Sequence, residues 1–232
     1  MNTDGKRLQV DAVIFDLDGT LIDSIGIYYK IVDVVFQKLN LPPVPREAFA
    51  AATKDGDFDW DCVLPDHTRD RKDELIKEAT AIIYDIYPQM FGKDLKLIPG
   101  ADAVLKQISS NGMKIGIVTS TPREGVSYKL QPLKKAGVEK LIEVIITADD
   151  VHNKKPAAEP LVECGRRLQV DPRQSVYVGD TRVDIKAGKA AQMRTIGVLT
   201  GFDDYISLQE EQPDAIVHSV MDLPKTIFIN SK

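Results

Sequence analysis

The chain has 232 residues, 43% of them hydrophobic and 28% charged, the balance of a globular protein with room for one domain and a small insertion. Its net charge of -5 argues against a general attraction to nucleic acid or anionic membranes, and no apolar run is long enough to cross a bilayer. The two cysteines, Cys62 and Cys164, have no metal-like spacing, so we expect free thiols and a cytoplasmic protein.

The first predicted element is a buried strand over residues 9–16, which runs directly into Asp16 and Asp18. Successive side chains of a strand point to opposite faces, so these two carboxylates should start on the same side. Gly19 allows a sharp turn, and Thr20 places a hydroxyl just beyond it. Two carboxylates this close repel unless a cation or a shared proton lies between them, so the pair is costly at a strand end but suits metal-assisted chemistry.

Residues 25–88 favour helices and contain no good strand signal. Apolar residues recur at helical spacing at positions 27, 31, 34, 35 and 39, and a proline-rich stretch at 41–45 ends that helix. Further helices are predicted at residues 46–52 and 70–87. We therefore predict a small all-helical domain over residues 23–92, inserted after the first strand.

After Pro99 and Gly100, predicted helices and strands alternate. Strands are expected at residues 114–119, 144–147, 175–179, 195–199 and 215–217, and helices at 101–109, 126–136, 157–168 and 183–191. Short apolar strands separated by amphipathic helices indicate parallel pairing, with helices on both faces. The predicted fold class is α/β, with a Rossmann-like parallel sheet built from residues 1–22 and 93–232 and the helical insertion beside it.

In such sheets ligands bind beyond the carboxyl ends of the strands, so the residues that follow each strand are the candidates for a site. These residues are Asp16 and Asp18, then Thr119 and Ser120, then Lys154 and Lys155, and finally Asp180 and Asp184. Hydroxyl groups, a cation and two pairs of carboxylates are thus expected at one rim of the sheet.

Each of these groups has a use in phosphoryl transfer. One carboxylate can attack phosphorus and form an acyl phosphate, and a second can protonate the leaving oxygen and later deprotonate water. Mg²⁺ prefers hard oxygen ligands and suits two or three carboxylates with water. Lysine and hydroxyl groups can hold the non-bridging oxygens of the phosphoryl group.

The four motifs, in this order, resemble those of the haloacid dehalogenase-like superfamily, in its branch of small phosphatases with a helical cap. The resemblance implies that Asp16 is the nucleophile and a Mg²⁺ ligand. It implies that Asp18 is the general acid and base, with its backbone carbonyl on the metal. Asp180 would ligate Mg²⁺ directly, and Asp184 would do so through water or orient other groups. A binding protein on an inactive scaffold is disfavoured, because no position of the pattern is missing.

The same resemblance assigns phosphoryl binding to Thr119 and Lys155, with Ser120 as a further contact. Taken singly, each motif has a simpler interpretation as a turn, a helix N-cap or a solvated surface charge. Lys155 is preferred over Lys154 because a proline follows it, as in the family pattern, and Lys154 stays open. Asp184 also fits the first turn of a helix, where the helix dipole favours an acid.

The acid at position 18 reduces the number of possible reaction types. By resemblance, dehalogenases and phosphonate hydrolases of the superfamily lack it, whereas phosphatases and sugar phosphomutases carry it. Among named relatives the chain is most similar to phosphoglycolate phosphatases, so glycolate phosphate is the default substrate, with a sugar phosphomutase or a pyrophosphatase as the alternative. The expected partner is a small phosphorylated metabolite, with no nucleic acid or membrane, and the chain is expected to be a monomer or a homodimer.

Selectivity is expected to come from the inserted helices, because the core motifs contact only phosphate and metal. Lys54, Asp55, Gly56 and Trp60 lie between two predicted helices of the insertion and are candidates to meet the substrate. For Trp60, burial within the insertion is the favoured alternative. We expect a lid-like motion about residues 24–26 and 92–99, with closure excluding bulk water.

Overall fold

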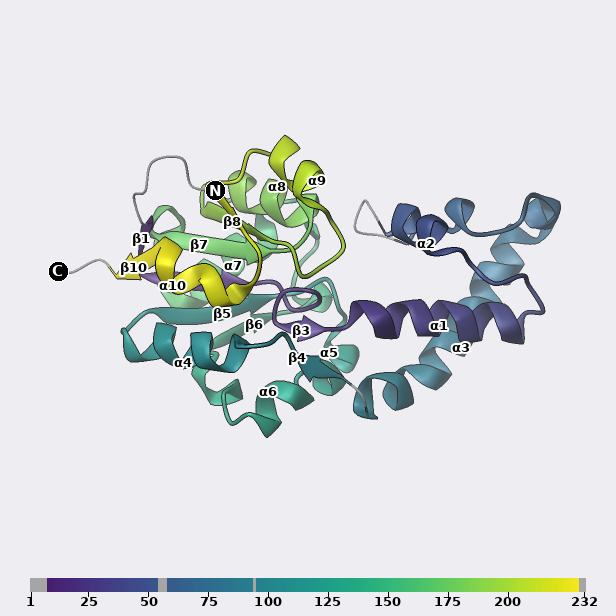
Figure 1. Ribbon diagram of the computed structural model, residues 1–232, viewed down its shortest axis with the longest axis horizontal. Coiled ribbons are helices and arrows are strands. Elements are labelled where there is room, and N and C mark those ends of the chain that lie inside the picture. The colour runs from purple at the N-terminus through teal and green to yellow at the C-terminus, as the bar shows by residue number, and fades with distance from the viewer. Residues whose placement is uncertain (1–7, 54–57, 94, 230–232) are drawn as a thin grey trace.

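The computed structural model describes residues 8–53, 58–93 and 95–229. Its centre is a six-stranded parallel sheet with the strand order β6-β5-β2-β7-β8-β9 (Figure 1). The strands are β2 (Ala12–Phe15), β5 (Lys114–Val118), β6 (Val144–Ile146), β7 (Ser175–Gly179), β8 (Arg194–Val198) and β9 (Ala215–Val217). These short apolar runs are the kind of strand that parallel sheets bury on both faces, and the predicted α/β class is confirmed.

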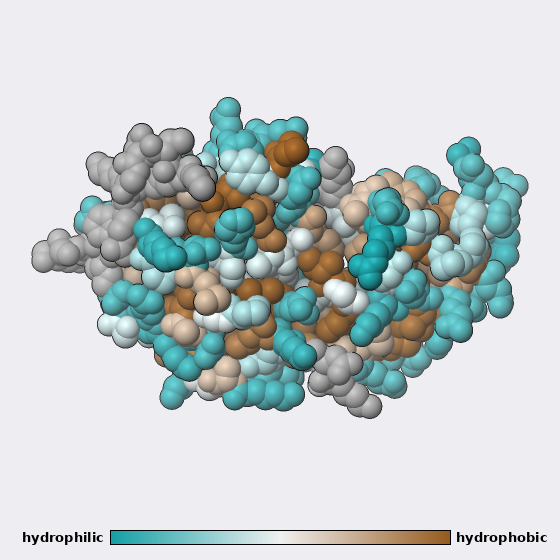
Figure 2. Space-filling view, viewed as in Figure 1, coloured by the Kyte–Doolittle hydropathy of each residue, from teal (hydrophilic) through white to brown (hydrophobic). Residues whose placement is uncertain are grey.

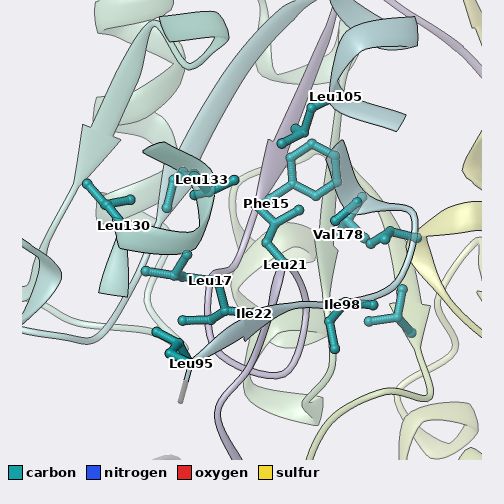
Figure 3. Packing of buried hydrophobic residues seen from close by; sticks show 14 of the residues in the cluster. Phe15, Leu17, Leu21, Ile22, Leu95, Ile98, Leu105, Leu130, Leu133 and Val178 are labelled. Carbon is teal, nitrogen blue, oxygen red and sulfur yellow. The ribbon is translucent and has the colours of Figure 1, made fainter. Parts of the chain in front are cut away.

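Helices cover both faces of the sheet, because side chains alternate between the faces along each strand. Ile14 and Tyr177 belong to a buried cluster with α7 (Glu159–Leu168) and α8 (Arg182–Ala190). Phe15 and Val178 point to the other face, where Leu105 of α4 (Ala101–Ser110) lies beside them (Figure 3). Further short helices of this lobe are α5 (Arg123–Lys129), α6 (Gln131–Lys135), η3 (Glu139–Leu141), η4 (Ala148–Asp150), η5 (Pro172–Gln174), α9 (Tyr205–Glu210), η6 (Val220–Asp222) and α10 (Leu223–Thr226).

The strand predicted over residues 9–16 is divided at Asp11, where the chain bends. The backbone of Asp11 bonds to Gln174 and Lys114, at the starts of the two strands that flank β2. The segment before the bend, β1 (Leu8–Val10), leaves the main sheet and pairs in parallel with β10 (Ile227–Ile229). Only β2 therefore enters the six-stranded sheet.

The helix predicted over residues 126–136 is also divided, into α5 and α6. Pro132 has no N–H to donate, so a continuous helix would lose a hydrogen bond at that residue. The two short helices meet at Leu130, which is the C-cap residue of α5 and the N-cap residue of α6. The direction of the chain therefore changes just after Lys129, the last residue of α5.

The helical insertion forms a lobe beside the lobe that contains the sheet (Figure 1). It begins and ends at an antiparallel pair of short strands, β3 (Ile22–Asp23) and β4 (Lys96–Leu97). Between them lie α1 (Ile25–Lys38), α2 (Arg46–Ala52), η1 (Trp60–Cys62), η2 (Asp66–Arg71) and α3 (Lys72–Lys93), and α1 packs against α3. The helical insertion is confirmed, and its treatment as a domain over residues 23–92 stays a prediction.

The long helix α3 differs from the helix predicted over residues 70–87, since it starts at Lys72 and continues through Pro88 to Lys93. A proline inside a helix removes one backbone hydrogen bond, a loss that packing against neighbouring helices can offset. Within the described ranges, no helix is both long and apolar enough to cross a membrane.

Candidate active site

The carboxyl end of β2 lies at the centre of the site. The neighbours of β2 in the sheet are β5 and β7, so Thr119, which follows β5, and Asp180, which follows β7, flank Asp16. Lys155 reaches the same point from the loop between β6 and α7, although it is 139 positions from Asp16 in the sequence. Side chains of all four predicted motifs line one cavity. The strand order thus gathers segments that are far apart along the chain.

Three buried carboxylates, those of Asp16, Asp180 and Asp184, each place one oxygen within 4.8 Å of the others. Burial raises the pKa of Asp16 to about 7, and the Asp184 carboxylate adds to the rise while the Lys155 ammonium opposes it. Burial, with the carboxylates of Asp16 and Asp184, raises the pKa of Asp180 well above its ordinary value. A divalent cation among these oxygens would relieve the repulsion, and carboxylate oxygens suit Mg²⁺. The donor set therefore fits such an ion.

Backbone and hydroxyl donors fix the orientation of Asp180. The hydroxyl of Thr20 donates to its Oδ1 over 3.0 Å, and the backbone N–H of Phe202 donates to its Oδ2 over 2.9 Å. A Cβ on Gly201 would lie 1.8 Å from that Oδ2, so only glycine fits beside the carboxylate. Gly19, whose φ is +74°, lets the chain turn sharply before Thr20. The turn after β2 therefore helps to hold the acid that follows β7.

Lys155 is the cation of the site. Its Nζ donates to Asp16 Oδ1 over 2.7 Å, to Asp184 Oδ1 over 2.6 Å and to the Tyr177 hydroxyl over 3.0 Å. Burial lowers the pKa of Lys155, but the carboxylates of Asp16 and Asp184 outweigh it and raise that pKa well above the ordinary value. Lys154 is exposed. Of the two neighbouring lysines, Lys155 is thus the one that lies among the acids.

The two carboxylate oxygens of Asp184 have different partners. Its Oδ2 accepts the hydroxyl of Thr181 over 2.6 Å and the backbone N–H of Thr181 over 3.1 Å, in a capping box that starts α8. Its Oδ1 accepts from Lys155, and the Tyr177 hydroxyl donates to the same Oδ1 over 3.1 Å. The helix-start interpretation and the site interpretation of Asp184 therefore describe the two oxygens of one carboxylate.

Two hydroxyl residues follow β5 at the edge of the cavity. Thr119 is buried, and its Oγ1 accepts the backbone N–H of Thr121 over 3.1 Å. Ser120 is exposed to solvent but lines the same cavity. Both predicted phosphate contacts thus line the same cavity as Asp16, and Thr119 is the more buried of the two.

A family model for haloacid dehalogenase-like hydrolases matches residues 13–198 of this chain. The chain belongs to the haloacid dehalogenase-like hydrolase family. It is 30% identical over 236 residues to the phosphoglycolate phosphatase of Escherichia coli K12, covering 94% of this chain and 92% of that protein. A phosphoglycolate phosphatase of Salmonella typhi is 31% identical over 238 residues, with the same coverage. The family match and these relatives confirm the predicted enzyme class, a haloacid dehalogenase-like phosphoric monoester hydrolase.

Solved structures of other proteins share the fold. A crystal structure from Haemophilus somnus, described as a phosphoglycolate phosphatase, superposes with a TM-score of 0.78 at 21% identity, covering 94% of this chain and 97% of its own. One from Thermotoga maritima, described as a beta-phosphoglucomutase, gives a TM-score of 0.66 at 24% identity, with 92% and 96% covered. At these identities the likeness concerns the fold alone, and that fold carries proteins described as phosphatases and as mutases.

The sequence did not single out two residues that hold Asp18 in this haloacid dehalogenase-like site. Lys129 Nζ donates to Asp18 Oδ2 over 2.6 Å, and the Thr121 hydroxyl donates to the same oxygen over 3.2 Å. Asp18 Oδ1 is buried and has no hydrogen-bond partner among the described residues. One oxygen of Asp18 is therefore anchored, and the other is left without a hydrogen-bond partner among the described residues.

Lys129 is fully buried and lies where the two lobes meet. Its Nζ donates to the Tyr28 hydroxyl and lies 4.9 Å from the centre of that ring and 5.1 Å from the centre of the Phe91 ring. Burial lowers the pKa of Lys129, but the Asp18 carboxylate outweighs it and raises that pKa. The sequence did contain a signal, because Lys129 lies at helical spacing from Val126 and Leu133, on a face that is otherwise apolar.

The cavity encloses about 370 Å³ between the two lobes. We call its polar side, formed by the strand-end motifs, the floor, and its side formed by the insertion the roof. Trp60, predicted as a substrate contact, lines the roof, with its ring centre 4.9 Å from that of Phe58. It is half-buried there, which agrees with partial burial within the insertion, and its contact with a substrate stays a prediction. The other three candidates, residues 54–56, lie outside the described residues.

Proposed function

We propose that this chain is a Mg²⁺-dependent phosphatase that hydrolyses a small phosphomonoester through a covalent phosphoryl–Asp16 intermediate. The observation that carries the proposal is the meeting of three buried carboxylates and Lys155 at the end of β2. A phosphoryl group is the anion that such a cluster can receive, because a cation and a lysine offset its charge next to a carboxylate nucleophile. The family match supports the same chemistry.

Asp16 and Asp18 divide the covalent work in this proposal. A carboxylate oxygen of Asp16 attacks phosphorus, the bond from phosphorus to the leaving oxygen breaks, and Asp18 gives that oxygen its proton. Asp18 then takes a proton from water, the water oxygen attacks phosphorus, and Asp16 and inorganic phosphate are released. The partner-free Oδ1 of Asp18 supports this role, because it is the oxygen not committed to Lys129.

Asp16, Asp180 and the backbone carbonyl of Asp18 would hold Mg²⁺ directly, and Asp184 would hold it through water or orient its neighbours. When bound, Mg²⁺ supplies charge that offsets the repulsion between the carboxylate nucleophile and the anionic phosphoryl group. The raised pKa values of Asp16 and Asp180 support a cation here, since these carboxylates lack a sufficient positive neighbour without one.

Thr119, Ser120 and Lys155 would hold the non-bridging oxygens of the phosphoryl group. Lys155 already spans Asp16 and Asp184, so its ammonium lies beside the carboxylate that would become phosphorylated. Thr119 flanks that carboxylate from β5, and its hydroxyl hydrogen is available because Oγ1 serves Thr121 as an acceptor.

The relatives make 2-phosphoglycolate the reference substrate for this proposal. A sugar phosphomutase is the second candidate, because the Thermotoga maritima structure shares the fold, and pyrophosphate hydrolysis is a third reaction that the floor could support. The two-domain division, with residues 1–22 and 93–232 as core and 23–92 as a closing cap, stays part of the proposal. A cytoplasmic location and a monomer or homodimer also stay predictions.

Phosphate release from 2-phosphoglycolate, p-nitrophenyl phosphate, pyrophosphate and sugar phosphates tests the proposal, with Mg²⁺ present and with chelator as control. We expect Mg²⁺-dependent release by the wild type and none by Asp16→Asn. Isomerisation of a sugar phosphate without net release would identify a mutase, and preferred cleavage of pyrophosphate a pyrophosphatase. Absence of all turnover with Mg²⁺ would contradict the proposed function.

A further inference from the structure

The roof of the cavity is apolar and largely aromatic. Side chains of this kind come from α1, α2, η1, α3 and the residue Phe58 before η1. They include Val32, Phe49, Phe58, Trp60 and Ile83. Figure 2 shows hydrophobic side chains gathered between the two lobes. Whatever group is attached to the phosphate must meet these side chains, because floor and roof line the same cavity.

The aromatic side chains of the roof continue into the floor. Phe49 is 6.2 Å from Phe58 and 6.4 Å from Phe202, measured between ring centres. Phe202 belongs to the lobe that contains the sheet, and its backbone N–H donates a hydrogen bond to Asp180. The apolar surface thus starts at a residue that fixes a proposed metal ligand and extends into the insertion. A group bonded to the phosphoryl oxygen would have aromatic contacts from its first atoms outward.

To a second anionic group, the described residues that line the cavity offer hydroxyl groups, such as those of Thr53 and Ser120, but no unpaired cation. Lys155 is the only basic side chain among the described residues that line the cavity, and it already contacts Asp16 and Asp184. Lys129 is fully buried and bonded to Asp18. Moving a carboxylate from water into mainly apolar surroundings without a neighbouring cation is strongly unfavourable. A leaving group with its own carboxylate, such as glycolate, therefore matches the described part of the roof poorly.

The size of the cavity also permits a larger leaving group. Its volume of about 370 Å³ falls within the range of ligand-sized pockets, roughly 300–1,000 Å³. Aromatic walls favour a ring, because ring pairs gain stabilisation beyond the area they bury.

We infer that the substrate's leaving group is an uncharged, mainly apolar alcohol or phenol of about ring size, so that the enzyme prefers apolar phosphomonoesters over phosphoglycolate. The inference rests on the proposed phosphatase function and names the substrate class of the same site. The floor recognises the phosphoryl group, and the roof selects by removing apolar surface from water.

The test compares kcat/KM, with Mg²⁺ present, for phosphate esters of primary alcohols. The alcohols differ in apolar size or in charge but have similar reactivity as leaving groups. Ethyl, butyl and hexyl phosphate all release a primary alcohol, and we expect kcat/KM to rise about fourfold per added methylene until the roof is filled. Benzyl and 4-carboxybenzyl phosphate differ by one carboxylate. We expect the charged ester to be roughly tenfold to a hundredfold poorer, and 2-phosphoglycolate to be poorer than benzyl phosphate.

A matched pair of aromatic variants locates the selectivity. Trp60→Ala should lower kcat/KM for benzyl phosphate about tenfold, while kcat/KM for ethyl phosphate changes little. Tyr84→Ala is the control, because Tyr84 is 68% exposed on α3 and is not among the residues that line the cavity. It should leave the ratio between the two substrates unchanged.

Three different results would overturn the inference. A kcat/KM for 2-phosphoglycolate above that for benzyl phosphate, or equal values for benzyl and 4-carboxybenzyl phosphate, would reject the apolar class while leaving the phosphatase function intact. If p-nitrophenyl phosphate and all other esters remain unhydrolysed with Mg²⁺, the proposed function itself fails, and the substrate class fails with it. Loss of ring preference in Trp60→Ala but not in Tyr84→Ala supports the roof as its source.

Discussion

The floor and the roof of the cavity are built by different means. Each floor side chain follows a strand, and neighbouring backbone, hydroxyl groups and opposite charges fix its orientation, as for Asp180 and Lys155. The roof is assembled from separate helices and the segment before η1, whose side chains meet mainly through apolar contact, as Phe49 and Phe58 do. Hydrogen bonds and ion pairs hold the floor side chains in one geometry, which the reaction requires. An apolar surface has no such requirement, so replacing one of its side chains can change which substrate it prefers. We therefore expect the floor to determine the reaction and the roof to select the group that is attached to the phosphate.

The largest expected effect comes from the centre of the floor. Asp16→Asn should reduce turnover by roughly 10⁴–10⁶-fold, the scale seen when a nucleophile is removed. Folding should be preserved, because the amide keeps the shape and removes one of the repelling buried carboxylates. The measurement is phosphate release alongside thermal unfolding. Activity near that of the wild type would exclude Asp16 as the nucleophile.

Asp18→Ala should have the next largest effect. Loss of the general acid and base should slow turnover by about 10²–10⁴-fold. The loss should be greater for benzyl phosphate than for p-nitrophenyl phosphate, because p-nitrophenolate leaves without needing a proton. Steady-state rates for the two esters measure this difference, and a decrease of less than about tenfold for benzyl phosphate would reject the assignment.

Lys129 contacts both Asp18 of the floor and Tyr28 of the insertion, so Lys129→Met tests whether the two sides of the cavity are coupled. We expect kcat to fall by about 10²-fold with little change in KM, since a catalytic group displaced by about 1 Å loses that much. As with Asp18→Ala, kcat should fall more for benzyl phosphate than for p-nitrophenyl phosphate. Lys135→Met, on the exposed side of α6, is the matched control and should behave as wild type. An equal loss for both esters would mean that Lys129 supports the structure without positioning Asp18.

Metal-free stability should report the repulsion within the floor. The pKa of Asp16 rises from 3.8 to about 7 on folding, so between these values the folded state binds more protons than the unfolded state. The contribution of Asp16 to the free energy of unfolding of the metal-free protein therefore falls as pH rises through that interval. Mg²⁺ at about 100 times its dissociation constant should add about 2.7 kcal/mol near neutral pH, or roughly 5–10 °C in Tm.

The Mg²⁺-induced rise in Tm should be smaller near pH 5, where protons compete for the same oxygens. Differential scanning fluorimetry with Mg²⁺ and with chelator measures both shifts. Asp180→Asn is the control, and the Mg²⁺-induced shift should be strongly reduced in it. Equal shifts at both pH values in the wild type would contradict a cation held by these carboxylates.

The sequence predicted the floor because its motifs are short and lie at strand ends. Apolar runs define the strands, parallel pairing brings their carboxyl ends together, and the pairing of β2 with β5 and β7 then follows the expected architecture. Asp16, Thr119, Lys155 and Asp180 could thus be placed at one rim before any contact was known. The division at Asp11 was not predictable in the same way, since it depends on a pairing of β1 with a strand at the far end of the chain.

Lys129 and the roof depend on how helices pack, which periodicity does not specify. A lysine on an apolar helix face indicates an unusual environment, but the identity of its partners follows from the contact of α5 with α3 and from the position of Tyr28 on α1. Likewise, helical spacing marks Phe49 and Ile83 as inward-facing without showing whether they pack in the insertion or line a cavity. Substrate preference was therefore harder to predict than reaction type.

Rapid acid quenching during the first turnover, followed by peptide mass spectrometry, tests the central assignment most directly. With Mg²⁺ and benzyl phosphate, the wild type should carry a phosphoryl group on the peptide containing Asp16, and Asp16→Asn should carry none. A phosphoryl group on any other residue, or phosphate formed in that turnover with no protein-bound phosphoryl group, would contradict it.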